Sequence, residues 1–264
     1  INVAHCPERV LPGRIMTELV ENDRIMGGIS TACTNKAIEL YQKFVRGQCL
    51  PTDAATAEMA KLTENAFRDV NIAFANELSV LADRQGVNVW ELIRLANHHP
   101  RVNILSPGPG VGGHCIAVDP WFLVDAAPEQ ANLIRTAREV NDGKPEVVIE
   151  KVKQSLKGID NPTIACLGLA FKANVDDLRE SPALDICHSL AAIKGASIAA
   201  VEPHISELPE ILRAFPNVSL TVPEAAIRAA DVIVLLVDHQ QFRDVPSLFD
   251  LSNLKVIDTR GQWQ

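Results

Sequence analysis

The segment from Asp53 to Gln85 constrains the fold of this chain more than any other. Its apolar residues recur in steps of three and four: Met59, Leu62, Ala66, Val70, Ala73, Phe74, Leu78 and Leu81. Such spacing places them on one face of a helix. No glycine or proline interrupts the segment before Gly86. The pattern predicts one helix about 50 Å long, at about 1.5 Å per residue. A helix of that length exceeds a small domain and indicates a spine between domains or between subunits.

The chain beyond residue 162 shows a second pattern, in which short apolar runs alternate with helical stretches. The runs cover residues 163–167, 197–201, 231–237 and 254–257, and the helical stretches cover 182–194, 205–214 and 223–230. Strand and helix in alternation predict a parallel sheet covered on both faces. The expected architecture is α/β, with a helical central domain at residues 52–158 followed by a doubly wound, Rossmann-like domain at residues 159–264.

Shorter helices are expected upstream of that sheet. They cover residues 13–22, 89–98, 118–126 and 131–156. Another helix is expected to follow Ser30, which can cap it. Pro145 is expected to mark a break or a fresh first turn in the last of these helices.

Composition narrows the class of protein. The 264 residues are 47% hydrophobic and 22% charged, as in a soluble globular protein. A net charge of −8 argues against a nucleic-acid-binding surface, although a few local cations can still hold an anionic small molecule. The six cysteines form no CxxC pair, so neither a disulfide framework nor a metal site is expected. With no signal peptide and no long apolar run, the protein is expected to be cytoplasmic.

The segment Gly108–Pro120, GPGVGGHCIAVDP, is the strongest chemical signal. Cys115 directly follows a glycine-rich turn and precedes a predicted helix, a position that exposes the sulfur and favours the thiolate. Glycines also let backbone amides approach a bound anion. The alternative is a buried cysteine beside a structural loop.

Two further candidates lie earlier in the chain. Lys61 and Asn65 are four residues apart and therefore share a face of the long helix, where a lysine could stabilise an oxyanion. Glu8 lies in CPERVLPG, between two prolines that would fix a carboxylate as a general base. A solvated helix face and an exposed turn are the alternatives.

The fourth candidate is GLAFKANVDDLRESP, residues 168–182. It follows the first strand of the predicted sheet and leads into a helix, which is where a ligand site is expected in a doubly wound fold. Lys172 and Arg179 could hold a diphosphate, while Asp176 and Asp177 could pin those cations or simply cap local structure. The dinucleotide fingerprint GxGxxG is absent from the chain.

These motifs, in this order together with AEMAKLTENAFRDVNIAFANE at residues 57–77, resemble the UDP-glucose/UDP-hexosamine 6-dehydrogenase family over essentially the whole chain. GPGVGGHCIAVDPWF resembles the N-acetylhexosamine branch. The segment NVWELIRLANHHPRVNIL is similar to the branch that oxidises UDP-N-acetylmannosamine for enterobacterial surface polysaccharide. The resemblance implies NAD as cofactor and a UDP-N-acetylhexosamine substrate oxidised at C6 to the uronate, and the long helix makes a homodimer the default expectation.

The resemblance also implies catalytic roles. Cys115 would trap the aldehyde as a thiohemiacetal, which a second oxidation turns into a thioester. Asp119 and Lys61 would flank the reacting oxygen, with Asn65 assisting. Glu8 would act as acid or base when the thioester is hydrolysed.

Binding roles are implied in the same way. The loop from Leu105, with Gly108, Gly110, Gly112 and Gly113, would hold the nucleotide sugar. Lys172 would face that loop, and Arg179 would lie toward the cofactor. Arg101 resembles the arginine that reaches the substrate across the dimer interface.

The family begins with a GxGxxG-bearing NAD-binding domain, so residues 1–51 are expected to be only its end plus connecting helices. Because the chain opens at Ile1 inside a strand, we expect an inactive fragment that lacks the main cofactor domain. Two other interpretations remain open. One is a non-catalytic nucleotide-sugar-binding module, and the other is the helical part of a hydroxyacid-type dehydrogenase, which would not need Cys115.

Overall fold

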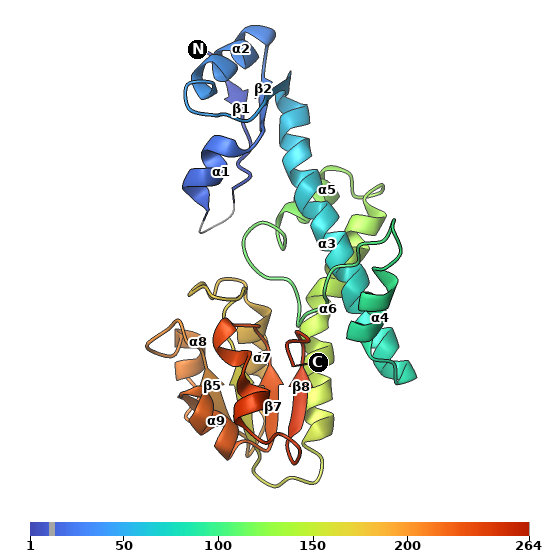
Figure 1. The fold of residues 1–264 in the computed structure, drawn as a ribbon, viewed down its shortest axis with the longest axis vertical. Helices are drawn as coiled ribbons and strands as arrows, with labels where there is room; N and C mark the ends of the chain where they lie inside the picture. Colours follow the sequence, from blue (N-terminus) through green and yellow to red (C-terminus); the bar gives the residue numbers. More distant parts are fainter. Residues whose placement is uncertain (11–13, 264) are drawn as a thin grey trace. The chain divides into compact units, whose positions relative to one another are not determined.

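The computed structural model describes residues 1–10 and 14–263, and Figure 1 shows its elements. The chain divides into two compact units, Ile1–Phe67 and Arg68–Gln264. The boundary falls inside α3, and each unit is described on its own below.

The first unit contains a small three-stranded sheet with the order β1-β2-β3. Its elements are β1 (Ala4–His5), α1 (Ile15–Glu21), β2 (Arg24–Gly28), α2 (Thr31–Tyr41), β3 (Cys49–Asp53) and the start of α3 (Ala54–Gln85). β2 and β3 are parallel, and α2 connects them as a βαβ unit. As predicted, Ser30 caps α2 by accepting a hydrogen bond from the amide of Cys33. Gly13, the predicted start of the first helix, lies outside the described residues.

The sequence pattern missed β2 and β3. β2 begins with an arginine and ends with two glycines, and β3 carries Pro51 in an edge strand, where a missing donor is tolerated. Neither strand shows the alternation of a half-buried strand, so periodicity gave no signal.

The second unit begins with a helical layer. α3 ends at Gln85, as predicted, and Gly86 adopts φ +66° directly after it. The other helices of this layer are α4 (Val89–Ala96), α5 (Asp119–Ala126) and α6 (Asn132–Ser155). α3 and α6 lie side by side and run in the same direction, because Asp69 contacts Arg138 and Asp83 contacts Lys151.

The break predicted at Pro145 was wrong, since α6 continues through it. Buried residues on both sides of the proline, among them Asn141 and Val148, hold the two halves of the helix in place. This packing offsets the backbone hydrogen bond that a proline removes.

The sheet of the second unit is fully parallel and has the order β6-β5-β4-β7-β8. Its elements are β4 (Thr163–Leu167), α7 (Pro182–Ala191), β5 (Ser197–Val201), α8 (Glu210–Arg213), β6 (Val218–Leu220), α9 (Pro223–Ala229), β7 (Val232–Leu235), η1 (Gln240–Phe242), α10 (Val245–Leu248) and β8 (Lys255–Asp258). The predicted doubly wound α/β fold is confirmed. The helix predicted at 205–214 is shorter, because Pro209 holds an extended backbone just before it.

Successive residues of each strand point to opposite faces of this sheet, and each face has its own core. On β4, Ile164 and Cys166 pack with α6 and α7, whereas Ala165 and Leu167 pack with α9. The carboxyl ends of β4, β5 and β7 therefore meet at one edge, where the loops that follow them lie close together. Among the described residues, no helix is long and apolar enough to span a bilayer.

Candidate functional site

Two of the predicted motifs pack against each other in the second unit. The glycine-rich loop at residues 108–113 lies on the loop at residues 168–182. A Cβ on Gly112 would lie 2.2 Å from the carbonyl oxygen of Glu180, and one on Gly113 would lie 2.9 Å from the ring of Phe171. Gly113 also adopts φ +86°. The glycines are therefore needed for the close approach of two backbones.

A buried polar chain anchors the first residue of the glycine-rich loop. Asn76 on α3 accepts a hydrogen bond from the amide of Gly108 at 2.8 Å and donates one to Asn141 on α6 at 2.9 Å. Asn141 in turn donates to the carboxylate of Asp69 at 2.8 Å. All three side chains are at most 1% exposed. Such groups are costly to leave unpaired, so they fix the loop relative to both helices.

Arg138 completes this chain by pairing with Asp69 at 2.5 Å and with Asp142. Burial raises the pKa of Asp69, and the neighbouring Arg138 guanidinium works in the opposite direction. Removing one partner of a buried ion pair leaves an uncompensated charge, at a typical cost of about 3–5 kcal/mol.

Cys115 lies on an exposed turn between the glycine-rich loop and α5. Its carbonyl accepts hydrogen bonds from the amides of Val118 and Asp119, at 3.1 and 2.8 Å. The residue is exposed, as predicted. The helix itself begins later than predicted, at Asp119 rather than Val118, so Cys115 lies four residues before it.

The cations of the loop at residues 168–182 differ in their environment. Lys172 is exposed, and no ion pair of its side chain is found among the described residues. Arg179 forms a two-pronged pair with Asp177 at 2.8 and 2.6 Å, which helps to lower the pKa of Asp177 to about 2. The prediction that Asp177 could pin this arginine therefore fits the structure, and a contact of Arg179 with the cofactor stays a prediction.

Sequence reasoning missed Arg260, which lies against the glycine-rich loop. A Cβ on Gly108 would lie 2.6 Å from its Nη1 atom. Asp258 shapes the turn after β8. Its carboxylate accepts hydrogen bonds of 2.7–2.9 Å from the amides of Arg260, Gly261 and Trp263. Arg260 also donates to Asp238 at 2.8 Å, and its side chain remains 31% exposed. An arginine directly after a strand of a parallel sheet was the available signal.

Two hollows near the glycine-rich loop are unsuited to a nucleotide sugar. One is lined by Lys144, Gly108 and Trp90, but its volume of about 70 Å³ is far below the several hundred Å³ of a ligand pocket. The other adjoins Val111 and Trp121, yet its charged lining is one arginine against Asp142, Glu180 and Asp185. That acidic excess disfavours a diphosphate. The cations Arg260 and Lys172 line neither hollow.

The remaining predicted residues of the second unit flank this loop. Arg101 is exposed, and Leu105 is half-buried. Between them the segment is fixed by Asn97, which donates to and accepts from the backbone of Ile104, at 3.0 and 2.7 Å. The segment that leads into the glycine-rich loop is therefore ordered by α4.

Three predicted residues belong to the first unit. Lys61 is half-buried and Asn65 is 5% exposed, and both lie on the same stretch of α3. Glu8 is exposed and accepts a hydrogen bond from the buried Arg24 at 2.7 Å. Its slight burial acts to raise its pKa, but the bonds from Arg24 and from the amide of Arg9 outweigh this and lower it. The carboxylate is therefore held ionised, as a base must be.

The first unit shares some features with a dinucleotide-binding domain. Its βαβ unit has the glycine pair Gly27–Gly28 at the β2–α2 turn. A Cβ on Gly28 would lie 2.3 Å from the amide nitrogen of Thr34. The hydroxyl of Thr34 also accepts a hydrogen bond from the amide of Gly28. Side chains of Ser30 and Thr34 thus fill this turn. The unit fits the framework of a dinucleotide-binding domain, while its turn does not serve as the phosphate loop.

Comparison with known families accounts for these parts. Three profiles of the UDP-glucose/GDP-mannose dehydrogenase family match: the NAD binding domain at residues 1–45, the central domain at residues 55–143 and the UDP binding domain at residues 165–264. The expectation that the NAD-binding domain is missing was therefore wrong in part. The matched residues lie within the segment 1–51 that was expected to hold only the end of this domain.

Individual relatives are also named as dehydrogenases of this kind. The chain is 63% identical over its whole length to the NDP-N-acetyl-D-galactosaminuronic acid dehydrogenase of Ralstonia nicotianae. It is 60% identical over 94% of its length to the UDP-N-acetyl-D-mannosamine dehydrogenase of Campylobacter jejuni. The chain spans 61% of the length of each of these relatives.

A solved structure shows the same fold. The UDP-D-ManNAc dehydrogenase of Pyrococcus horikoshii matches with a TM-score of 0.87 and 41% identity, over the whole chain and 62% of that structure. Profiles of one family, in family order, thus cover most of the sequence. The chain belongs to the UDP-glucose/GDP-mannose dehydrogenase family.

Proposed function

We propose that this chain carries the substrate and thiol site of an NAD-dependent UDP-N-acetylhexosamine 6-dehydrogenase. The observation that carries the proposal is the packing of the glycine-rich loop on the loop at residues 168–182, beside the exposed Cys115. Backbone amides of a glycine-rich loop together with Arg260 and Lys172 suit a diphosphate. An exposed thiol next to them suits capture of an aldehyde.

The chemistry assigned to this chain centres on Cys115. NAD, when bound, takes up a hydride from C6 of the sugar in each of the two oxidations. Between them, the Cys115 thiolate adds to the C6 aldehyde and forms a carbon–sulfur bond. After the second oxidation the adduct is a thioester, and water breaks the carbon–sulfur bond to release the carboxylate and the free thiol.

The surrounding groups would handle charge and protons. By resemblance, Lys61 and Asp119 flank the oxygen on C6 and Asn65 assists them, while Glu8 directs water to the thioester. The pair with Arg24 keeps Glu8 ionised and able to accept a proton. The roles of Lys61, Asn65 and Glu8 rest on the motif resemblance alone, as does that of Arg101.

For the sugar we propose UDP-N-acetylmannosamine, oxidised to the uronate for surface polysaccharide. The names of the Campylobacter jejuni and Pyrococcus horikoshii relatives support this substrate. A second candidate is the galacto isomer, because the Ralstonia nicotianae relative, at 63% identity, is named for N-acetyl-D-galactosaminuronic acid. The two sugars differ in configuration at C2, which carries the acetamido group, and at C4, which carries a hydroxyl group.

The test is the stoichiometry of oxidation. In the full-length protein with NAD and UDP-N-acetylmannosamine, the proposal predicts two NADH per uronate, and Cys115→Ser should abolish uronate while leaving UDP binding within about twofold. Unchanged turnover in Cys115→Ser would instead favour a one-step hydroxyacid-type dehydrogenase. UDP binding with no oxidation of any UDP-N-acetylhexosamine would favour the non-catalytic binding module. The absence of turnover expected for this chain itself stays a prediction.

A further inference from the structure

Glu202 is a buried carboxylate at the carboxyl end of β5, and the proposed chemistry does not use it. It is 4% exposed. Its Oε2 atom accepts hydrogen bonds from the amides of Leu169 and Ala170 at 2.8 and 3.0 Å. Both amides belong to the loop that follows β4, the loop that carries Lys172. A charged hydrogen bond of this kind is about twice as strong as a neutral one.

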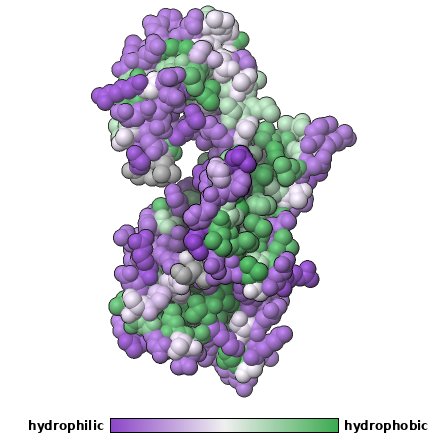
Figure 2. Space-filling view, turned by 45° about the vertical axis from the view of Figure 1, so that its right-hand side comes forward, coloured by the Kyte–Doolittle hydropathy of each residue, from purple (hydrophilic) through white to green (hydrophobic). Residues whose placement is uncertain are grey.

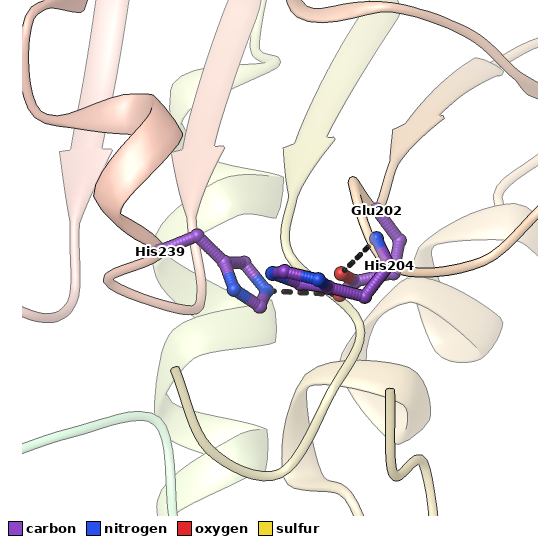
Figure 3. A group of neighbouring side chains, drawn as sticks. All are labelled: Glu202, His204 and His239. Carbon is purple, nitrogen blue, oxygen red and sulfur yellow. Dashed lines mark hydrogen bonds and ion pairs between the residues drawn. The ribbon is translucent and has the colours of Figure 1, made fainter. Parts of the chain in front are cut away.

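His239, after β7, is the second buried group at this edge. It is fully buried, and its Nε2 lies 3.0 Å from Oε2 of Glu202 (Figure 3). The amide of Asn174 donates to its Nδ1 at 2.9 Å. Because Nδ1 accepts, the ring proton lies on Nε2 and is donated to the carboxylate. His239 therefore connects Glu202 to the middle of the loop at residues 168–182.

These contacts do not suit a metal ion, although the residue types would. One ligand atom each from Glu202, His204 and His239 lies within 4.8 Å of the others (Figure 3). However, both ring nitrogens of His239 and the Oε2 atom of Glu202 are already committed to hydrogen bonds. Nε2 of His204 is a buried atom without a partner within the described part of the chain, but one such atom does not hold an ion.

The contacts of Glu202 differ from those of the acidic residue at the equivalent strand end of a dinucleotide-binding domain. There, an acidic residue at the end of the second strand binds the ribose of the cofactor, and the amides after the first strand face phosphate. Here the carboxylate turns inward and occupies the amides of Leu169 and Ala170 itself. Burial acts to raise its pKa, but the bonds from His239 and from those amides lower it overall, so the group is ionised.

We infer that Glu202 and His239 are positioning residues that hold the loop at residues 168–182 in the shape that binds the nucleotide diphosphate. The inference rests on the proposed function, because it assigns that loop to UDP. The loop's Phe171 ring lies under Gly113, so its position also sets that of the glycine-rich loop. Neither Glu202 nor His239 touches the ligand in this scheme.

The experiment is calorimetric titration of UDP into the chain and its Glu202→Gln variant. The amide group of glutamine cannot accept all the hydrogen bonds of the carboxylate, so we expect affinity to fall about tenfold or more, which corresponds to 1.4 kcal/mol. Glu202→Asp, which keeps the charge, should recover part of the loss. Glu224→Gln, an exposed change on α9, should bind UDP like the wild type.

A spectroscopic readout separates positioning from general destabilisation. In Glu202→Gln the NMR amide signals of Leu169 and Ala170 should shift and exchange faster with solvent, while those of Ile164 and Ala165 on β4 stay protected. If Glu202→Gln does not fold, His239→Gln gives the same test, because it cannot bridge Glu202 and Asn174 at once. In turnover of the full-length protein, the loss should appear in KM for the nucleotide sugar and leave kcat at saturation within about twofold.

The outcomes are distinct. If the wild-type chain fails to bind UDP, the proposed function is contradicted, and this inference is contradicted as well. Wild-type chain that binds UDP while Glu202→Gln and His239→Gln bind it equally well, despite altered amides of Leu169 and Ala170, overturns the inference alone.

Discussion

Lys144 shows at the scale of one residue how much this structure relies on buried charge. It is 8% exposed on α6 and donates a hydrogen bond to the hydroxyl of Ser79, which itself donates to the carbonyl of Asn76. Burial lowers the pKa of Lys144 to about 8, with Asp83 acting in the opposite direction. The lysine belongs to the α3–α6 layer that also anchors the glycine-rich loop. Its charge is therefore tolerated there at a cost in stability.

That cost predicts a pH dependence. Between pH 8 and 10.5 the folded chain loses the proton of Lys144 while the unfolded chain keeps it, so the free energy of unfolding rises with pH. Relative to Lys144→Met, the gain should be on the order of 2–3 kcal/mol. Urea unfolding of both proteins at pH 7.5 and 10.5 measures this gain. The other titratable groups are common to both proteins, so their contributions cancel in the difference between the two free energies of unfolding. A difference that stays constant with pH would contradict this account, and Lys151→Met, at an exposed position, should show no such trend.

At the scale of elements, the candidate site is a contact between two loops rather than a pocket in one. The glycine-rich loop is fixed from behind by Asn76, and the loop at residues 168–182 by Glu202 and His239. What brings the loops together is the absence of side chains at Gly112 and Gly113. The contact should therefore be sensitive to a single methyl group.

Gly112→Ala tests this contact. The new Cβ would lie 2.2 Å from the backbone oxygen of Glu180, so one loop must move, and we expect UDP affinity to fall about tenfold or more in calorimetry. Gly143→Ala is the matched control. It lies within α6 with nothing near its Cβ, so it should bind UDP normally and stabilise the fold by about 0.5–1 kcal/mol. Normal UDP binding by Gly112→Ala would show that the loop contact does not shape the site.

The same scale shows what the sequence allowed. The α3 helix was predicted to within a residue, because its signal is a local period, and β4 and β5 were located by their apolar runs. β2 was not, because Arg24 and the two glycines owe their strand conformation to pairing with β3. For the site, Cys115 and the two loops carry local motifs. Glu202 lies more than 30 residues from the amides that it binds, a contact that only the folded sheet creates.

At the scale of the whole molecule, several large apolar residues of the second unit are exposed. Phe74 and Leu81 on α3 are 53% and 45% exposed, and Leu95 and Phe122, on α4 and α5, are more exposed still. Figure 2 shows hydrophobic side chains gathered on the surface of this unit. Contiguous exposed apolar surface of this kind indicates an interface. The long helix led us to expect a homodimer, and these residues support that proposal.

The dimer can be tested by sedimentation. Wild-type chain should sediment as a dimer at micromolar concentration, and Phe74→Glu with Leu81→Glu should shift it to monomer, because buried charges at an apolar interface are costly. Leu248→Glu places the same charge at a 72% exposed leucine of α10 and should leave the dimer intact. A wild-type chain that sediments as a monomer would contradict the proposal.

The most direct test of the central claim is the rate at which iodoacetamide alkylates Cys115, followed by mass spectrometry with and without UDP-N-acetylmannosamine. The measurement needs no NAD, and the half-buried Cys49 of the first unit is an internal control. If the nucleotide sugar binds beside this thiol, ligand at ten times its dissociation constant should slow alkylation of Cys115 about tenfold and leave Cys49 unchanged. Equal rates at Cys115 with and without the sugar nucleotide would contradict the account.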